Sequence, residues 1–227
     1  MKVLIADDHS LYRAGLSLLL KDRLGIQEII EVSSLDEALD LLAHHGNMKL
    51  ALFDLSMPGM AGPESLGAVK STYPETFVAV ISGSEDRHNV LKCISAGLSG
   101  YIPKSLSEDD IAKALTSILA GSVFVPTFMM TGAHASKPSA SPSLSPAPPT
   151  PSFEGLTPRQ QDVLSNIIQG RSNKEIARQL DIAEGTVKIH LAALFAHFGA
   201  HNRTELATRA QSMRNGQGMS LGRDGLN

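Results

Sequence analysis

The sequence predicts an α/β doubly wound, five-stranded parallel sheet followed by a small all-α domain. Three observations lead to this fold class. Five short apolar runs alternate with five amphipathic stretches in the first half of the chain. A proline-rich stretch then interrupts the pattern, and only helical spacing follows it. The 227 residues are enough for two ordinary domains.

The apolar runs have the length and composition of buried strands, and the stretches between them have helical spacing. We expect strands at 2–7, 27–32, 49–54, 76–82 and 99–102. We expect helices near 10–22, 34–45, 62–72, 86–96 and 107–120. Repeated strand–helix units of this kind form a parallel sheet, and ligands bind outside the carboxyl ends of its strands.

The domain boundaries follow from composition. We expect the first domain at 1–121, a Pro/Ser/Ala-rich linker at 122–152, the helical domain at 153–212 and a disordered tail at 213–227. The stretch "SKPSASPSLSPAPPTPS" cannot bury a core, because proline removes backbone donors and fixes φ. A proline-motif ligand for another protein is an alternative, but a plain spacer is the simpler interpretation.

Charge and cysteine content narrow the function classes. Residues 1–121 carry 10 Lys and Arg against 16 Asp and Glu, whereas residues 153–213 carry 7 against 6. The first half is therefore a poor candidate for binding nucleic acid, and the second half a weak one. The single cysteine, Cys93, falls in a helical pattern, where it is more often a packed apolar residue than a reactive thiol. With neither a secretory nor a membrane-spanning pattern, we expect a cytoplasmic protein with no membrane partner.

Polar residues follow four of the predicted strands. Asp7 and Asp8 end the first, Asp54 the third and Ser82 the fourth, and Lys104 follows the fifth. Because carboxyl ends of parallel strands share one edge, these side chains converge. Clustered carboxylates repel unless a cation compensates them, and Mg²⁺ prefers oxygen ligands. The adjacent pair alone is also typical of a solvated turn, so the argument depends on the other three residues.

The motifs around these residues resemble the receiver domain of two-component response regulators, which has a flavodoxin-like fold. The resemblance rests on the Asp7–Asp8 pair, "LFDLSMPGM", "VISGS" and "GYIPKS", and it spans residues 1 to about 121. It implies that Asp54 accepts a phosphoryl group from a histidine kinase. It also implies that Asp8, Asp54 and the backbone carbonyl of Ser56 hold Mg²⁺, with Asp7 acting largely through water.

The same resemblance assigns roles to three further residues. Lys104 and the Ser82 hydroxyl would contact the phosphoryl oxygens. Ser82 and Tyr101 would form a switch pair, in which the hydroxyl moves toward the phosphate and the ring turns inward.

Residues 153–212 contain the start and stop signals of several short helices. Thr157, Pro158 and Gln160 match a capping box with proline at the first helical position, which predicts a helix at about 158–169. Ser172 can cap "NKEIARQL", and "TVKIHLAALFAHFG" resumes helical spacing after a short turn. A helix, a short turn and a second helix form the arrangement that reads a major groove.

This segment resembles a LuxR-type helix-turn-helix through "LTPRQQDVL", "GRSNKEIARQL", "EGTVKIHL" and "NRTEL". Together with the receiver resemblance, it identifies the chain as a member of the NarL/FixJ subfamily of response regulators. The resemblance implies promoter DNA as a partner and a homodimer, controlled by phosphorylation, through a last helix at about 203–212. The implied DNA-contacting residues are Asn173, Lys174, Thr186, Val187, Lys188, Ile189, His190 and Arg203. Periodicity alone is also consistent with a solvated face at Lys188 and His190.

The segment departs from relatives in ways that weaken the expected DNA binding. Ala183 stands where a serine cap is frequent, and Ala192, Ala196, His197 and His201 stand at positions that are often basic. Fewer phosphate contacts lower affinity and its dependence on salt.

The leading functional hypothesis is a transcription regulator that is not an enzyme and whose DNA binding is controlled by phosphorylation of Asp54. One alternative is a phosphorylation-independent DNA-binding protein whose receiver serves only for docking or dimerisation. Another is a Mg²⁺-dependent phosphatase, but such hydrolases need a second acid two residues after the nucleophile, where this chain has Ser56. Whether the receiver covers the recognition helix at rest stays open at the level of sequence.

Overall fold

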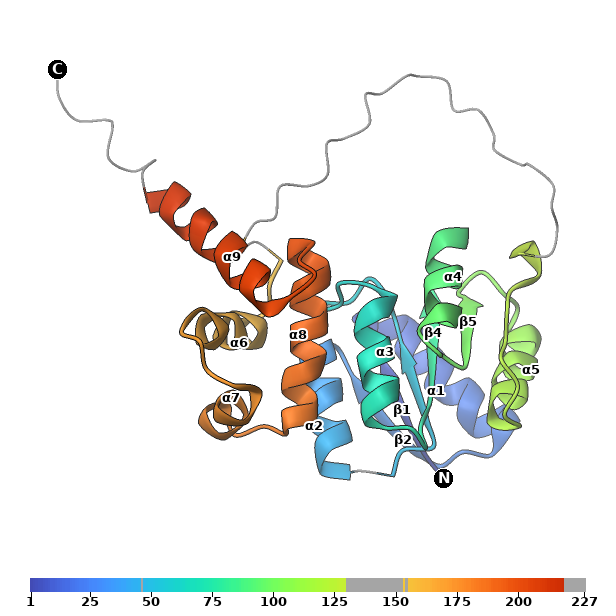
Figure 1. Cartoon of the computed structure of the whole chain (residues 1–227). Coiled ribbons are helices and arrows are strands. Elements are labelled where there is room, and N and C mark those ends of the chain that lie inside the picture. The colour runs from blue at the N-terminus through green and yellow to red at the C-terminus, as the bar shows by residue number, and fades with distance from the viewer. Residues whose placement is uncertain (46, 130–152, 154, 219–227) are drawn as a thin grey trace, which may run out of the picture.

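The computed structural model describes residues 1–45, 47–129, 153 and 155–218, and they form two domains in contact (Figure 1). The predicted linker at 122–152 lies mostly outside the described residues. The first domain is a parallel sheet with helices on both faces, and the second is entirely helical. The predicted fold class is confirmed.

Within its described residues, the first domain contains five strands and five α-helices. Its strands are β1 (Lys2–Ala6), β2 (Glu28–Val32), β3 (Leu50–Phe53), β4 (Phe77–Ser82) and β5 (Gly100–Pro103). Its helices are α1 (Ser10–Leu24), α2 (Leu35–His45), α3 (Pro63–Thr72), α4 (Arg87–Ser95) and α5 (Glu108–Leu119). The strand order is β2-β1-β3-β4-β5 with every neighbouring pair parallel. The order reverses direction beside β1, which places a ligand site at the ends of β1 and β3.

The sheet is buried on both faces because successive strand residues point to opposite sides. Leu4 and Phe53 belong to the apolar cluster beneath α2, α3 and α4. Ile5 and Leu52 belong to the cluster beneath α1 and α5. The strands therefore read as continuous apolar runs, and the polar residues of the domain gather where the strands end.

Residues 122–129 are attached to the first domain, although the sequence predicts that they begin the linker. The backbone of Phe124 accepts a hydrogen bond from Tyr101 N and donates one to Ser99 O, at 3.1 and 3.0 Å. A 3₁₀ turn at Thr127–Met129 follows, and the Arg87 guanidinium donates to the carbonyl oxygens of its last two residues. The physical reason is that β5 is an edge strand whose backbone groups need partners.

The second domain consists of α6 (Pro158–Ile168), α7 (Asn173–Leu180), α8 (Glu184–Phe198) and α9 (Arg203–Gly218). The predicted capping box is present at Thr157 for α6, and the predicted cap at Ser172 of α7 is part of a second capping box. Ala183 provides no side-chain cap for α8, as expected. α9 continues to Gly218, so residues 213–218 are helical and not part of a disordered tail. The remainder of the predicted tail lies outside the described residues.

The two domains meet along α8, which packs mainly against α3 and also against α2 (Figure 1). Ile189 of α8 is fully buried in the apolar cluster of the first domain. Gly185 allows close approach, because a Cβ added there would lie 2.6 Å from Thr72 Cγ2 on α3. We call this packing of α8 on α2 and α3 the closed arrangement.

Candidate functional site

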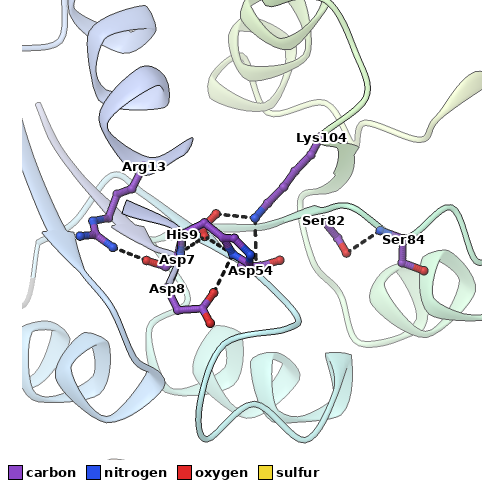
Figure 2. Close-up of polar contacts among 8 residues, drawn as sticks. All are labelled: Asp7, Asp8, His9, Arg13, Asp54, Ser82, Ser84 and Lys104. Atoms are coloured by element: carbon purple, nitrogen blue, oxygen red, sulfur yellow. Dashed lines mark hydrogen bonds and ion pairs between the residues drawn. The ribbon is translucent and has the colours of Figure 1, made fainter. Parts of the chain in front are cut away.

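The carboxyl edge of the sheet gathers the charged residues that the sequence predicted to converge (Figure 2). Asp7 and Asp8 follow β1, Asp54 follows β3 and Lys104 follows β5. Asp7 and Asp54 are buried, with 0% and 1% of their surface exposed, whereas Asp8 is open to solvent. We call Asp7, Asp8, Asp54 and Lys104 the sheet-edge cluster.

Lys104 provides the positive charge of this cluster. Its Nζ lies 2.7 Å from Asp7 Oδ2 and 3.3 Å from Asp54 Oδ2. It also lies 4.6 Å from the centre of the Tyr12 ring. One ammonium group therefore bridges the two buried carboxylates and partly compensates their repulsion.

Asp54 has an electrostatic environment suited to a reactive carboxylate. Burial is the largest effect and raises the pKa of Asp54; Asp7 also raises it, while Lys104 and the Ser56 backbone N–H lower it. Asp54 Oδ1 is buried, and no donor among the described residues makes a hydrogen bond of ordinary length and angle to it. A buried carboxylate oxygen without a partner is costly unless a ligand or cation completes it. The oxygen donors fit Mg²⁺, which the sequence analysis predicted here.

His9 also belongs to this site, and sequence reasoning missed it. Its Nδ1 lies 2.8 Å from Asp8 Oδ1, 3.4 Å from Asp7 Oδ1 and 3.9 Å from Asp54 Oδ2. One donor atom from each of these four residues lies within 4.8 Å of the others, close enough to surround one metal ion. One feature of the sequence could have indicated His9, namely its position directly after the pair Asp7 and Asp8. Because His9 is the N-cap residue of α1 and has extended backbone angles, its direction depends on the short loop between β1 and α1.

Ser82 and Tyr101 lie at the opposite side of the edge from Asp8. The buried Ser82 hydroxyl accepts a hydrogen bond from Ser84 N at 3.2 Å (Figure 2). The Tyr101 ring is fully buried, and its hydroxyl donates to Ser84 O at 2.5 Å. A ring in this position has no further inward turn to make. The inward turn that the sequence predicts for Tyr101 is therefore already complete in this structure.

The predicted DNA-contacting residues of α8 divide into three groups. Thr186, Ile189 and His190 are at most 1% exposed and face the first domain. Lys188 is exposed to solvent. Val187 belongs to the core of the second domain itself, so its side chain has no free surface with which to contact DNA.

The remaining predicted DNA contacts lie at the start of α7 and α9. Arg203 donates one hydrogen bond to Asn173 Oδ1 at 3.0 Å and another to the carbonyl oxygen of Arg171. These bonds place Arg203 and Asn173 side by side although 30 residues separate them. Lys174 is exposed beside them. The three residues form a polar patch suited to phosphate oxygens.

His190 and Asp36 face each other across the domain boundary. His190 Nδ1 lies 3.7 Å from Asp36 Oδ1 on α2. Burial, with a smaller contribution from the positive charge of Arg159, lowers the pKa of His190 to about 4. Burial raises the pKa of Asp36, and the Thr157 hydroxyl opposes that change. Both groups are thus driven toward their neutral forms.

A buried carboxylate cluster beside a lysine, on a sheet joined to a helix-turn-helix, defines a class of protein: a signal-receiving domain coupled to a DNA-binding domain. Comparison with family models agrees with this class. The response regulator receiver domain matches residues 3–116, and the luxR family of bacterial regulatory proteins matches residues 154–210. The chain belongs to the response regulators of two-component systems that carry a LuxR-type DNA-binding domain, and it is a transcription regulator.

Similar proteins span nearly the whole chain. A glycerol metabolism activator of Pseudomonas putida is 36% identical over 205 residues, covering 90% of this chain and 92% of that protein. The nitrate/nitrite response regulator protein NarL of Escherichia coli K12 is 32% identical over the same shares of the two chains. The predicted membership of the NarL/FixJ subfamily is consistent with these relatives.

Solved structures of similar fold include a LuxR-family two-component response regulator from Aurantimonas. It is 25% identical, has a TM-score of 0.52 and covers 57% of this chain and 91% of its own. The RcsB response regulator of Salmonella typhimurium has a TM-score of 0.51 at 20% identity, covers 93% of this chain and 98% of its own, and shows the fold alone. Within the described ranges, we find no helix that is both long and apolar enough to cross a membrane.

Proposed function

We propose that phosphorylation of Asp54 by a histidine kinase separates the two domains and releases α8 to bind promoter DNA. The observation that carries this proposal is the burial of α8. Three of the residues expected to touch DNA lie beneath the first domain in the closed arrangement, so α8 cannot enter a major groove in that state. The sheet-edge cluster lies on the same domain and provides the site at which the signal arrives.

The chemistry at the sheet edge follows from the positions of the side chains. Asp54 is the nucleophile: one carboxylate oxygen forms a bond to phosphorus, and the bond from phosphorus to the imidazole nitrogen of the kinase histidine breaks. That nitrogen leaves with the electron pair and takes up a proton from water. Lys104 is close enough to Asp54 to donate to a phosphoryl oxygen. The Ser82 hydroxyl provides a second donor.

A magnesium ion fits the same site. Asp8, Asp54 and the backbone carbonyl of Ser56 would hold it, with Asp7 acting through water. When bound, it supplies positive charge that offsets the repulsion between the carboxylates and the incoming phosphoryl group. This assignment is supported by Asp54 Oδ1, which is buried and lacks a hydrogen bond of ordinary length and angle among the described residues.

The released domain would bind promoter DNA as a homodimer. Lys188, Thr186, Ile189 and His190 would face the groove, and Asn173, Lys174 and Arg203 would contact phosphates. α9 is a long helix with an exposed face at Thr204 and Thr208, which supports its predicted role in dimerisation. A protein with these partners works in the cytoplasm, and its chemistry ends with the phosphorylated Asp54.

The test compares the full-length protein with Asp54→Asn, which keeps the shape of the side chain but removes the nucleophile. Asp22→Asn, at an exposed position on α1, is the matched control. Acetyl phosphate with MgCl₂ should label the wild type and the control but not Asp54→Asn. Labelling should also raise affinity for a duplex selected from a random library by at least tenfold, or ~1.4 kcal/mol.

Two outcomes would contradict the proposal. If the label survives Asp54→Asn, the phosphoacceptor is another residue. If the wild type binds the duplex equally well with and without phosphorylation, the receiver is a docking module, as in the first alternative. Turnover of acetyl phosphate far beyond one equivalent would instead support the phosphatase alternative.

A further inference from the structure

We propose that Gln160 holds the closed arrangement through a hydrogen bond to the backbone of Gly59, in the loop that follows Asp54. The bond would couple events at Asp54 directly to release of α8. This inference rests on the proposed function in one respect only, that the closed arrangement is the resting state. It assigns to Gln160 an interdomain role beyond its role as a helix cap.

Both ends of the Gln160 amide are used. Its Oε1 accepts a hydrogen bond from Thr157 N at 3.1 Å, which completes the capping box of α6. Its Nε2 donates to Gly59 O at 2.8 Å, across the domain boundary. The side chain is only 2% exposed, so water cannot replace the second bond.

The capping box does not require glutamine, because glutamate serves equally well at this position. A glutamate, however, has no N–H to donate when ionised, and its carboxylate would face the Gly59 carbonyl in a buried contact. The amide is therefore needed for the contact with the receiver and not for the helix.

The backbone conformation of Gly59 and its lack of a side chain both favour this contact. Its φ is +85°, and a Cβ there would lie 3.1 Å from Thr157 Cγ2 and 3.4 Å from Leu35 Cβ. The neighbouring Pro58 O accepts a hydrogen bond from Leu35 N at 3.2 Å. The Gly59 carbonyl is thus held between the start of α2 and the cap of α6, with no side chain in the way.

The loop links this contact to the sheet-edge cluster over a few residues. Gly59 lies five residues after Asp54 and three after Ser56, whose backbone N–H already acts on the Asp54 carboxylate. A change at Asp54 that moves the Ser56 backbone also moves the Gly59 carbonyl. Because hydrogen bonds weaken steeply once their angle falls below about 120°, a rotation of the Gly59 peptide that takes the angle below this value would break the contact.

The rest of the interface does not compensate for such a loss. Among the described residues, the buried atoms Asp36 Oδ1 and His190 Nδ1 lie 3.7 Å apart and lack a hydrogen-bond partner. Unpaired buried polar atoms disfavour the closed arrangement, since water would satisfy them after separation. One well-formed hydrogen bond therefore has a large influence on the balance between closed and open states.

A disulfide trap measures that balance without phosphorylation or DNA. Thr72 Cβ lies 3.8 Å from the position of a Cβ added at Gly185, which is the spacing of a disulfide. In the full-length chain carrying Thr72→Cys and Gly185→Cys, mild oxidation should cross-link α3 to α8 only in the closed arrangement. The native Cys93 is buried and does not compete.

Gln160→Glu in this background is the test, and Gln161→Glu is its matched control. Gln161 adds the same charge one residue later, but its amide bonds Leu156 O inside the second domain. At pH 8 we expect Gln160→Glu to slow cross-linking at least tenfold and Gln161→Glu to leave it unchanged. The thermal midpoint of the second domain should stay unchanged in Gln160→Glu, because the cap is kept, and should fall slightly in Gln161→Glu, because that variant loses the bond to Leu156 O.

The outcomes separate this inference from the proposed function. Equal cross-linking rates in the two variants, or no cross-linking in the parent, would overturn the role of Gln160. If Gln160→Glu slows cross-linking but acetyl phosphate with MgCl₂ does not, the interdomain bond stands and the proposed control by phosphorylation fails. If both slow it, both are supported.

Discussion

The sheet-edge cluster and the domain interface both bury polar side chains, but they compensate them differently. At the sheet edge, Asp7 and Asp54 share the ammonium of Lys104. At the interface, Gln160 is uncharged, and burial drives His190 and Asp36 toward their neutral forms. The sheet-edge cluster keeps its side chains charged and compensates them with an opposite charge. The interface is stable while His190 and Asp36 are neutral.

The largest expected effect comes from removing the positive charge at the sheet edge. Lys104→Met leaves Asp7 and Asp54 buried and without their partner, so the free energy of unfolding of the first domain should fall by about 3 kcal/mol. Urea unfolding at pH 7 in EDTA measures it. Adding Asp7→Asn should recover part of the loss, because it removes the carboxylate nearest the ammonium. A loss below about 1 kcal/mol would mean that solvent already screens the pair.

The next effect concerns the apolar part of the interface. Ile189→Ala removes a fully buried side chain that packs against the first domain, so the closed arrangement should lose about 2–3 kcal/mol. Cross-linking of the Thr72→Cys/Gly185→Cys chain should slow more than tenfold. Val187→Ala is the control: Val187 lies in the core of the second domain, and its loss should lower the thermal midpoint without selective opening.

A smaller effect is the response of the interface to pH. The pKa of His190 is about 4 in the closed arrangement, against an ordinary value near 6.5 once α8 faces water. The open state therefore binds more protons below pH 6.5, and acidification should favour opening. Between pH 7.5 and 5.5 the shift is about tenfold, or ~1.4 kcal/mol. Asp40 faces the ring with negative charge and Arg159 with positive charge. Asp36 also faces the ring, and its raised pKa opposes the trend.

NMR titration of the His190 ring in the full-length chain checks this directly. The pKa should be about 4 in the wild type and should rise toward 6.5 in Gln160→Glu. Small-angle scattering over the same pH range should show expansion in the wild type and a weaker response in His190→Gln. An ordinary pKa in the wild type would show that the ring is open to water.

The smallest effect concerns the start of α8. Ala183 gives no side-chain hydrogen bond, whereas Ser172 caps α7 fully. Ala183→Ser should stabilise the second domain by about 0.5–1 kcal/mol, measured by thermal unfolding. Ala196→Ser, at an exposed position inside the same helix, is a control that should give no gain.

The sequence predicted the receiver site more completely than the interface for a topological reason. Asp7, Asp54, Ser82 and Lys104 each follow a strand, and parallel strands bring such positions together whatever the helices do. His9 was missed because its direction depends on the loop between β1 and α1. The positions of Thr186 and His190 on α8 were predicted, but their burial was not, because it requires the other domain.

The sequence by itself determined the succession of strands and helices along the chain, the caps at Thr157 and Ser172 and the convergence of carboxylates at one sheet edge. These depend on periodicity, on local hydrogen bonds and on the geometry of parallel sheets. Only the tertiary structure decided that α8 lies on α3, that residues 122–129 extend the receiver and that Gln160 reaches Gly59. The last contact joins residues 101 positions apart. No local sequence pattern indicates that the Gln160 amide nitrogen, which the capping box leaves free, will bind a carbonyl in another domain.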